Sequence, residues 1–226
     1  MSIAIEALRR GISRLCHFTD SRNLAHMHDG ADAIQATADL LKAQQAIFHV
    51  TDVLRIDGHA DKVCCSIEYP NAWYFDVARK RDPIFADWVV LLIDPERLST
   101  PGTMFCPCNA AKGGGAYIQS GGAAFSALFA ARALTGRRRH TNQLLCSPTD
   151  DQAEVLVPGP IGLSELLGVG VADEAQAKRE YVRLEQLGHR PSRFRWIIAP
   201  HFFQKLVLSA AIRRGERPVE TVWLPV

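Results

Sequence analysis

Two charged side chains have the chemistry needed to handle a nucleotide: Arg55 in "LRIDGH" and Glu154 in "DDQAEVLVPG". A planar guanidinium holds phosphate or carboxylate through paired donors. A carboxylate at the mouth of a strand can hydrogen-bond a ribose hydroxyl and stabilise positive charge that grows on a sugar ring. Each residue also has an ordinary explanation, because an arginine beside a turn usually faces solvent and a glutamate can simply end a strand in water. Residue type alone leaves both interpretations open.

A cysteine and a histidine stand side by side in "CHFT". Neighbouring side chains on a strand point to opposite faces, so Cys16 and His17 cannot form a nucleophilic dyad, and a cysteine hydrolase is disfavoured. His17 at the edge of the core is the structural alternative. The six cysteines lack the paired spacing of a zinc site. We expect them to be reduced thiols that pack as small hydrophobes, and we predict no metal.

Two further segments could contact a nucleotide or a nucleic acid. The aromatic residues of "SIEYPNAWY" are either ordinary packing or a stacking wall for a base or a nicotinamide ring. The segment "RALTGRRRHTN" is either a solvated loop or a phosphate-binding patch. The side chains concerned are Tyr69, Trp73 and Tyr74 in the first segment and Arg132, Arg137, Arg138 and Arg139 in the second.

The chain has the size and composition of one globular domain over residues 1–226. Of its 226 residues, 47% are hydrophobic and 22% charged, with a formal net charge of +2. No apolar run approaches the ~20 residues that cross a bilayer. The start, "MSIAIEALRRGISRL", has the pattern of an amphipathic helix rather than a signal peptide. We therefore expect a cytoplasmic protein without a membrane segment.

Short strands and helices in irregular order must position these side chains. The patterns predict strands over 13–20, 62–70 and 87–95, two more within 153–171, and an edge strand over 218–226. They predict helices over 4–12, 21–28, part of 31–46, 71–83, 123–134, 173–188 and 200–215. This order favours an α+β fold with a mixed or antiparallel sheet. No dinucleotide fingerprint or P-loop is present.

Five motifs, taken together in their order and spacing, resemble the DarT family of DNA ADP-ribosyltransferase toxins. They are "CHFTDSRNL", "LRIDGHADKVCCSIEYPN", "DWVVLLIDPE", "FCPCNAA" and "DDQAEVLVPGPI". The resemblance implies an ADP-ribosyltransferase-like split antiparallel sheet, flanked by helices, that holds NAD in a central cleft. It implies an enzyme that cuts the bond between nicotinamide and ribose and joins ADP-ribose to a base in single-stranded DNA. A cognate antitoxin that removes the ADP-ribose is the implied partner.

The resemblance also assigns roles to individual residues. It implies that His17, Phe18 and Thr19 bind NAD, that Arg55 is catalytic and contacts NAD, and that Glu154 is the catalytic glutamate. Tyr69 and Tyr74 are expected at the same NAD site, and Arg132, Arg137, Arg138 and Arg139 are expected to hold the DNA backbone. The segment from 106 to 154 resembles the loop that reads the acceptor.

The motifs "RIDGH" and "SIEYPN" look more like the guanosine-directed branch of the family, so guanine is the favoured acceptor. Cys108 stands where that pattern has arginine. Thymidine, RNA or protein as acceptor, and a non-catalytic nucleic-acid-binding module, are the alternatives.

Overall fold

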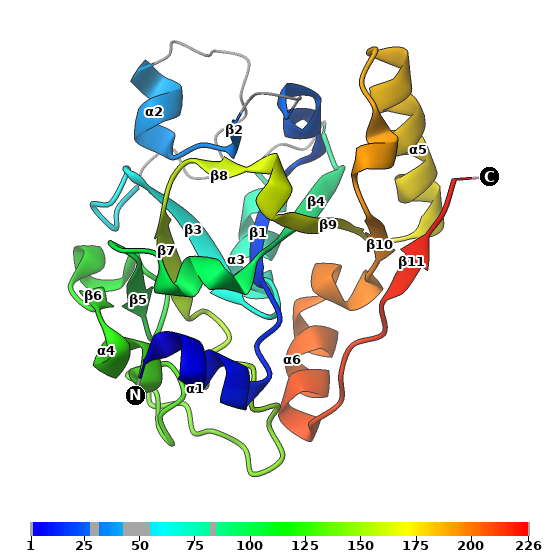
Figure 1. Ribbon diagram of the computed structural model, residues 1–226. Helices are drawn as coiled ribbons and strands as arrows, with labels where there is room; N and C mark the ends of the chain where they lie inside the picture. Colours follow the sequence, from blue (N-terminus) through cyan, green and yellow to red (C-terminus); the bar gives the residue numbers. More distant parts are fainter. Residues whose placement is uncertain (1, 28–31, 43–54, 82–84, 226) are drawn as a thin grey trace.

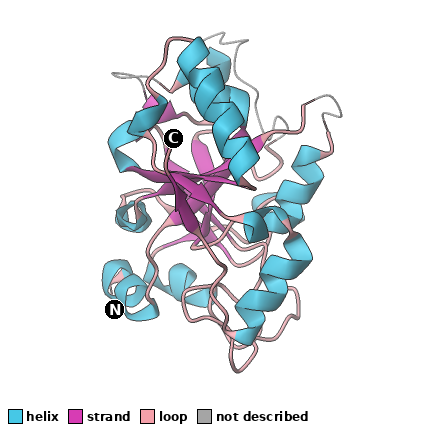
Figure 2. Cartoon of the chain, turned by 90° about the vertical axis from the view of Figure 1, so that its right-hand side faces the viewer, coloured by secondary structure: helices cyan, strands magenta, loops and turns pink. Residues whose placement is uncertain are grey.

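The computed structural model describes residues 2–27, 32–42, 55–81 and 85–225. Among these residues, nine strands form one sheet in the order β11-β10-β9-β4-β1-β3-β7-β5-β6, with helices packed around it (Figures 1 and 2). All adjacent pairs are antiparallel except β9 and β10, which are parallel. The strands of this sheet are β1 (Leu15–Asp20), β3 (Lys62–Ile67), β4 (Trp88–Ile93), β5 (Met104–Cys106), β6 (Gln119–Ser120), β7 (Glu154–Pro158), β9 (Leu166–Val171), β10 (Trp196–Ile198) and β11 (Thr221–Trp223).

Helices and a small second sheet complete the fold. The short strands β2 (Asp32–Ile34) and β8 (Ile161–Gly162) pair with each other. The helices are α1 (Ile3–Arg10), α2 (Thr37–Lys42), α3 (Ala72–Arg79), α4 (Gly122–Ala127), α5 (Glu174–Gln186) and α6 (Lys205–Arg214). No helix among the described residues is long and apolar enough to span a membrane.

The sheet is divided into two halves between β1 and β3. β1 pairs with β4 along its whole length, and β3 pairs with β7 along its first four residues. Only two residue pairs join β1 to β3: Leu15 with Ile67 and Cys16 with Ser66. We call these two pairs the junction. Because β1 and β3 separate beyond the junction, a cleft lies between the two halves.

The core holds the half with β1 in a fixed position. Every side chain of β4, "WVVLLI", is buried, as its unbroken apolar run predicts for a central strand. On the neighbouring strand, Phe18 stacks on Phe75 of α3 with 4.7 Å between ring centroids. Phe75 also packs against Phe203, in the 3-10 turn Pro200–Phe203 that precedes α6. The strand that carries His17 is therefore braced by packing on both of its sides.

Buried polar groups brace the closed end of the cleft at the junction. Glu68, directly after β3, is 1% exposed and has a left-handed φ of 64°. Its carboxylate accepts hydrogen bonds from the Ser13 backbone at 2.7 Å and from Arg217 at 3.2 Å. Arg14 donates to the Glu68 carbonyl at 2.9 Å and pairs with both oxygens of Glu220 at 2.6 and 2.5 Å. These bonds tie residues 217 and 220 to the start of β1.

The predicted elements are largely present, but several differ in type, number or length. The stretch 153–171 holds three strands, β7, β8 and β9, where two are predicted, and the edge strand predicted over 218–226 spans only Thr221–Trp223. The segment 21–28 is a 3-10 helix over Ser21–His26, and in 31–46 the described residues hold β2 before α2, with 43–46 outside them. The helix predicted over 123–134 ends at Ala127. The helix predicted over 200–215 is a 3-10 turn followed by α6, because Gln204 has the extended φ of −131°. The sheet also includes β5, β6 and β10, whose two or three residues are too short to show a period.

Candidate active site

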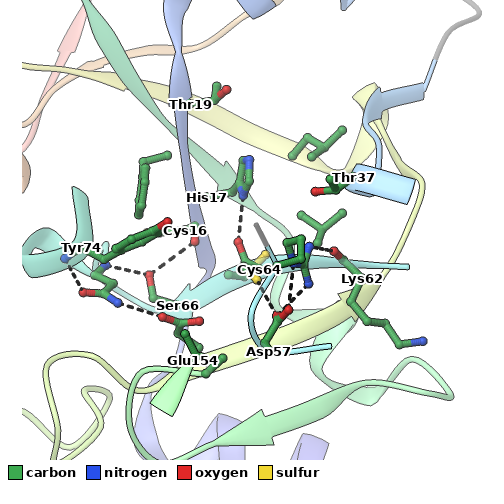
Figure 3. Close-up of a pocket in the computed structure, with 18 of the residues that line it drawn as sticks. Cys16, His17, Thr19, Thr37, Asp57, Lys62, Cys64, Ser66, Tyr74 and Glu154 are labelled. Carbon is green, nitrogen blue, oxygen red and sulfur yellow. Dashed lines mark hydrogen bonds and ion pairs between the residues drawn. The ribbon is translucent and has the colours of Figure 1, made fainter. Parts of the chain in front are cut away.

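The cleft between the sheet halves brings together residues that are far apart in the sequence (Figure 3). Its cavity has a volume of about 190 Å³. From one half it is lined by His17, Phe18 and Thr19 of β1, and from the other by Cys64 and Ser66 of β3 and Glu154 of β7. Arg55 and Tyr74 also line it. The structure thus places six of the expected site residues in one cleft.

Glu154 is the first residue of β7 and pairs across the ladder with Cys106 of β5. It is only 7% exposed although it carries a carboxylate. Its Oε1 atom accepts hydrogen bonds from the side-chain amides of Asn71 at 3.1 Å and Asn109 at 3.0 Å. A buried carboxylate is tolerated only when donors satisfy it, and these two amides do so. The interpretation of Glu154 as a solvated strand end is therefore wrong.

Arg55 lies in the turn that precedes β3 and is 8% exposed. Its guanidinium forms a two-pronged pair with Asp57, at 3.0 and 2.8 Å, and donates to the backbone carbonyls of Lys62 at 2.6 Å and of His59. Burial opposes ionisation of Asp57, but the hydrogen bonds and charge of Arg55 outweigh it and lower the pKa of that carboxyl. Arg55 is thus a buried, oriented cation in the wall of the cleft rather than a surface residue.

His17 reaches across the separation between the two halves. Its Nδ1 atom lies 2.8 Å from the backbone carbonyl oxygen of Cys64 on β3. Because a carbonyl only accepts, Nδ1 is the protonated nitrogen. Burial lowers the pKa of His17, and the charge of Arg55 acts in the same direction. The ring is therefore neutral and fixed, with Nε2 as a hydrogen-bond acceptor.

Aromatic side chains form one wall of the cleft. Phe18 contacts Tyr74 with ring centroids 5.9 Å apart, and both line the cavity. Arg81 lies over the Tyr74 ring at 5.4 Å and donates to its hydroxyl at 3.3 Å. Thr19, which also lines the cavity, accepts a hydrogen bond from Asn23 at 2.8 Å. An apolar wall with a polar rim suits a flat ring such as a base or nicotinamide.

The structure does not bring Tyr69 to this cleft. Tyr69 is 5% exposed and packs edge-on against Phe202 in the core. Trp73 also lies elsewhere, donating to Asp151 at 3.3 Å with Lys205 over its ring. Of the three aromatic residues in "SIEYPNAWY", only Tyr74 lines the cavity, because Tyr69 precedes α3 and the helix directs Trp73 and Tyr74 to different sides.

The arginine segment, residues 132–139, is only partly available to a ligand. Arg139 donates to the backbone carbonyls of Leu144 at 2.7 Å and Ser147 at 2.8 Å. Arg137 pairs with Asp151. Arg132 and Arg138 are exposed and form a backbone bridge. Arg139 and Arg137 therefore hold the loop that leads to β7, and contact of the four arginines with DNA stays a prediction.

The cysteines behave as packing residues. Cys106 and Cys108 are 0% and 1% exposed, and their sulfurs lie 3.8 Å apart in a small apolar cluster with Ala110 and Leu156. Burial raises the pKa of the Cys106 thiol to about 12. Position 108 therefore points into the interior, where a long cation would not fit. Among the described residues no group of histidine, cysteine or acidic side chains could hold a metal ion.

Sequence reasoning did not single out Asn71 and Asn109, which hold Glu154. Asn71 is the N-cap of α3, and its position after Pro70 before a helix is a recognisable signal for a cap. Asn109 lies in "FCPCNAA", quoted above as a motif without a role for this residue. Neither position indicates by itself that its amide faces a carboxylate 83 or 45 residues later.

The divided sheet and the carboxylate at the mouth of β7 define the ADP-ribosyltransferase-like class of folds that the motifs imply. A protein-family model described as "DarT: ssDNA thymidine ADP-ribosyltransferase, DarT" matches residues 16–204. Because this match covers more than half of the chain, the protein belongs to the DarT family. No curated protein matches the sequence.

Solved structures of this family share the fold. A structure titled "Thermosipho africanus DarTG in complex with ADP-ribose" superposes with a TM-score of 0.56 at 14% identity, over 84% of this chain and 51% of that one. "Thermus sp. 2.9 DarT in complex with NAD+" gives 0.52 at 14% identity, over 84% of this chain and 97% of that one. The complex of the Thermus protein with ADP-ribosylated single-stranded DNA gives 0.52 at 12% identity, over 85% and 97%. The chain therefore spans about half the length of the Thermosipho protein.

Proposed function

We propose that the protein is an NAD-dependent ADP-ribosyltransferase that modifies a base in single-stranded DNA. The observation that carries the proposal is the buried carboxylate of Glu154, held by two amides in a cleft that also contains His17 and Arg55. Membership of the DarT family supports both the reaction and the acceptor. The Thermus relative, solved with NAD+ and with ADP-ribosylated single-stranded DNA, supports the same substrates.

The residues of the cleft fit the chemical groups of NAD. The Phe18 and Tyr74 wall offers a face for the nicotinamide ring. The fixed Nε2 atom of His17 can accept a hydrogen bond from a ribose hydroxyl. Arg55 supplies positive charge beside the diphosphate, and its pairing with Asp57 keeps it oriented.

The role of Glu154 follows from the charge that develops during bond cleavage. When the bond between the nicotinamide nitrogen and the ribose carbon breaks, both bonding electrons leave with nicotinamide and the sugar becomes positive. A fixed carboxylate lowers the energy of that state more than it lowers the energy of bound NAD. A nitrogen of the DNA base that carries a proton then attacks the sugar carbon and loses that proton, and Arg55 is the residue proposed to assist this step.

Guanine is the proposed acceptor, because "RIDGH" and "SIEYPN" resemble the guanosine-directed branch. The matching family model is described with thymidine. Arg132 and Arg138 are the proposed contacts to the DNA backbone, since they are the exposed members of the arginine segment. A cognate antitoxin that removes ADP-ribose is the proposed partner, by resemblance to the toxin family.

The test combines the purified chain with NAD and four matched single-stranded oligonucleotides, each lacking one of the four bases. Mass spectrometry should find one added ADP-ribose on every oligonucleotide except the one without guanine. If only the oligonucleotide without thymine stays unmodified, thymine replaces guanine as the acceptor. The absence of an adduct on all four, together with no release of nicotinamide, would overturn the proposal in favour of a non-catalytic binding module.

Glu154→Gln separates catalysis from folding in this experiment. The glutamine keeps an oxygen that can accept from Asn71 and Asn109 but removes the negative charge, so we expect transfer to fall by about 10³-fold. Glu185→Gln is the matched control, because Glu185 is exposed on α5. The control should retain wild-type activity, and both variants should unfold at nearly the wild-type temperature.

A further inference from the structure

The two amides that contact Glu154 come from opposite sides of β7. Asn71 follows β3, which pairs with β7 on one side, and Asn109 follows β5, which pairs with β7 on the other. Asn71 is 3% exposed. Both amides donate to the same atom, Oε1 of Glu154. The carboxylate is therefore held by the segments that follow the two strands flanking its own.

Each asparagine is fixed at its other end by the backbone. The Oδ1 atom of Asn71 accepts from the Tyr74 N–H at 3.1 Å, as the cap of α3. The Oδ1 atom of Asn109 accepts from the Ala111 N–H at 3.1 Å. Because an N–H can bond only to the oxygen of the amide, these contacts decide which end of each side chain is the NH₂ group. The donors that face Glu154 are thus set by local backbone geometry.

A further hydrogen bond links this arrangement to the junction of the sheet halves. The backbone N–H of Asn71 donates to the hydroxyl of Ser66 at 3.1 Å, and that hydroxyl lies 3.4 Å from the carbonyl of Cys16. Ser66 and Cys16 are one of the two pairs that join β1 to β3. Asn71 is therefore connected through Ser66 to both halves of the sheet.

We propose that Asn71 and Asn109 are positioning residues that hold the Glu154 carboxylate ionised and in a single orientation for catalysis. The proposal rests on the function proposed above, in which Glu154 stabilises the positive sugar. Two donors on Oε1 favour the charged form and fix the rotation of the carboxylate, so that the orientation of Oε2 is fixed with it. A misplacement of about 1 Å in a catalytic group costs about 10²-fold in rate.

The titratable groups around Glu154 do not compete for this role. Cys64 on β3, and Cys106 and Cys108 beside β5, are its thiol neighbours, together with Cys65 on the far face of β3. Burial raises the pKa of each of these thiols above its ordinary value, so they stay neutral in the assay range. Of the other charged groups that line the cleft, Arg55 and Asp57 are paired with each other, Lys62 is paired with Asp61, and Arg81 donates to the Tyr74 hydroxyl.

Asn→Asp substitutions test the proposal because they change only the end of the side chain that faces Glu154. In Asn71→Asp and Asn109→Asp, one carboxylate oxygen still accepts the backbone N–H, so the cap is kept. The NH₂ donor becomes an oxygen, which repels Glu154 when both groups are ionised. When the pH falls and the pair shares a proton, the O–H group can donate and the original contact returns.

The measurement is nicotinamide release as a function of pH, with kcat and KM for NAD determined separately. We expect each Asp variant to lose about 10²-fold in kcat near pH 8 with KM changed by less than about threefold. The ratio of variant to wild-type kcat should rise as the pH is lowered to about 5. Asn71→Ala and Asn109→Ala cannot regain a donor, so their ratio should stay flat. Asn142→Asp, an exposed site, is the control for the added charge.

A readout without turnover separates this proposal from the proposed function. The carboxyl carbon of Glu154, followed by ¹³C NMR in the free protein, should titrate at higher pH in both Asp variants than in the wild type. If this shift is found but the wild type never releases nicotinamide, the positioning role stands and the proposed reaction fails. The positioning role is wrong if the wild type is active and the folded Asp variants have the same kcat. It is also wrong if the ratio of variant to wild-type kcat is independent of pH in the Asp variants as well as in the Ala variants. Measuring both sites keeps the test decisive when one variant does not fold.

Discussion

The cleft and the arginine segment are both charged regions, but their arginine side chains make different contacts. In the cleft, Arg55 is buried, fixed by Asp57 and two carbonyls, and part of the cavity wall. In the arginine segment, Arg139 and Arg137 bond to the loop that leads to β7, while Arg138 is exposed. Closely spaced arginines can therefore serve to hold a loop, as Arg137 and Arg139 do.

The loop before β7 is long, and this explains why arginines of the segment are needed to hold it. Residues 128–153 contain no strand and no α-helix, so their backbone carbonyls need other donors. A guanidinium supplies several donors from one side chain, and Arg139 satisfies two such carbonyls. Asp151 completes the support by accepting from Arg137, Arg213 and Ser209. The loop is thereby anchored to α6 immediately before Glu154.

In the comparison of these two regions, the largest expected effect is that of Arg55→Lys. A lysine keeps the charge but cannot contact Asp57 through two prongs and both carbonyls at once, so nicotinamide release should fall by about 10²-fold or more. Arg138→Lys is the matched change in the other region and should leave nicotinamide release unaltered. Equal losses in the two variants would contradict the distinction between the regions. Both rates are measured with NAD alone, before DNA is added.

A smaller effect, on stability as well as rate, is expected for Gly115→Ala. A Cβ atom at Gly115 would lie 2.4 Å from the carbonyl oxygen of Asp57, and the backbone has a φ of +86°. The methyl group must displace the turn that holds Arg55, which should lower the free energy of unfolding by about 3 kcal/mol and reduce activity. Gly114→Ala has a φ of +62° and no atom within 4 Å, so it should cost only about 1 kcal/mol. Denaturant unfolding of the pair measures the difference.

The smallest of these effects is expected for the arginine segment itself. Arg139→Ala leaves the carbonyls of Leu144 and Ser147 without their donor, so it should lower the free energy of unfolding by about 2 kcal/mol. Arg138→Ala should change it by less than about 0.5 kcal/mol but weaken DNA binding and its salt dependence. The reverse pattern, with Arg138 needed for stability and Arg139 for DNA alone, would invalidate the assignment.

The sequence predicted the strands that have a clear pattern and the residues that match the family motifs. The buried run of β4 and the cap signals of α3 and α5 are local, so they could be recognised without a structure. The joint order of the motifs led to His17, Arg55 and Glu154, which the fold brings into one cleft. The short strands β5, β6 and β10 were not predicted, because two or three residues are too few to show the alternation of apolar and polar side chains.

Contacts that no local sequence pattern reveals account for what the sequence did not predict. Tyr69 was expected beside NAD, yet Phe202, far along the chain, provides a core partner for it. Arg139 has a structural role that the sequence did not indicate, because the carbonyls it satisfies belong to a loop whose conformation no local pattern specifies. Asn109 was overlooked because its significance depends on Glu154, 45 residues later. For Tyr69 and Asn109 the partner is set by tertiary packing, and for Arg139 it is set by the irregular course of its own loop.

The bond between Arg14 and Glu220 has a consequence for how the protein is made. These two residues are 206 positions apart, and their pair closes the same end of the sheet that joins β1 to β3. A ribosome synthesises the chain from the N-terminus, so every residue of the cleft has emerged well before Glu220 does. The brace at the junction is therefore completed late in synthesis. A growing chain lacks the pair between Arg14 and Glu220 until the segment with Glu220 can fold back onto β1.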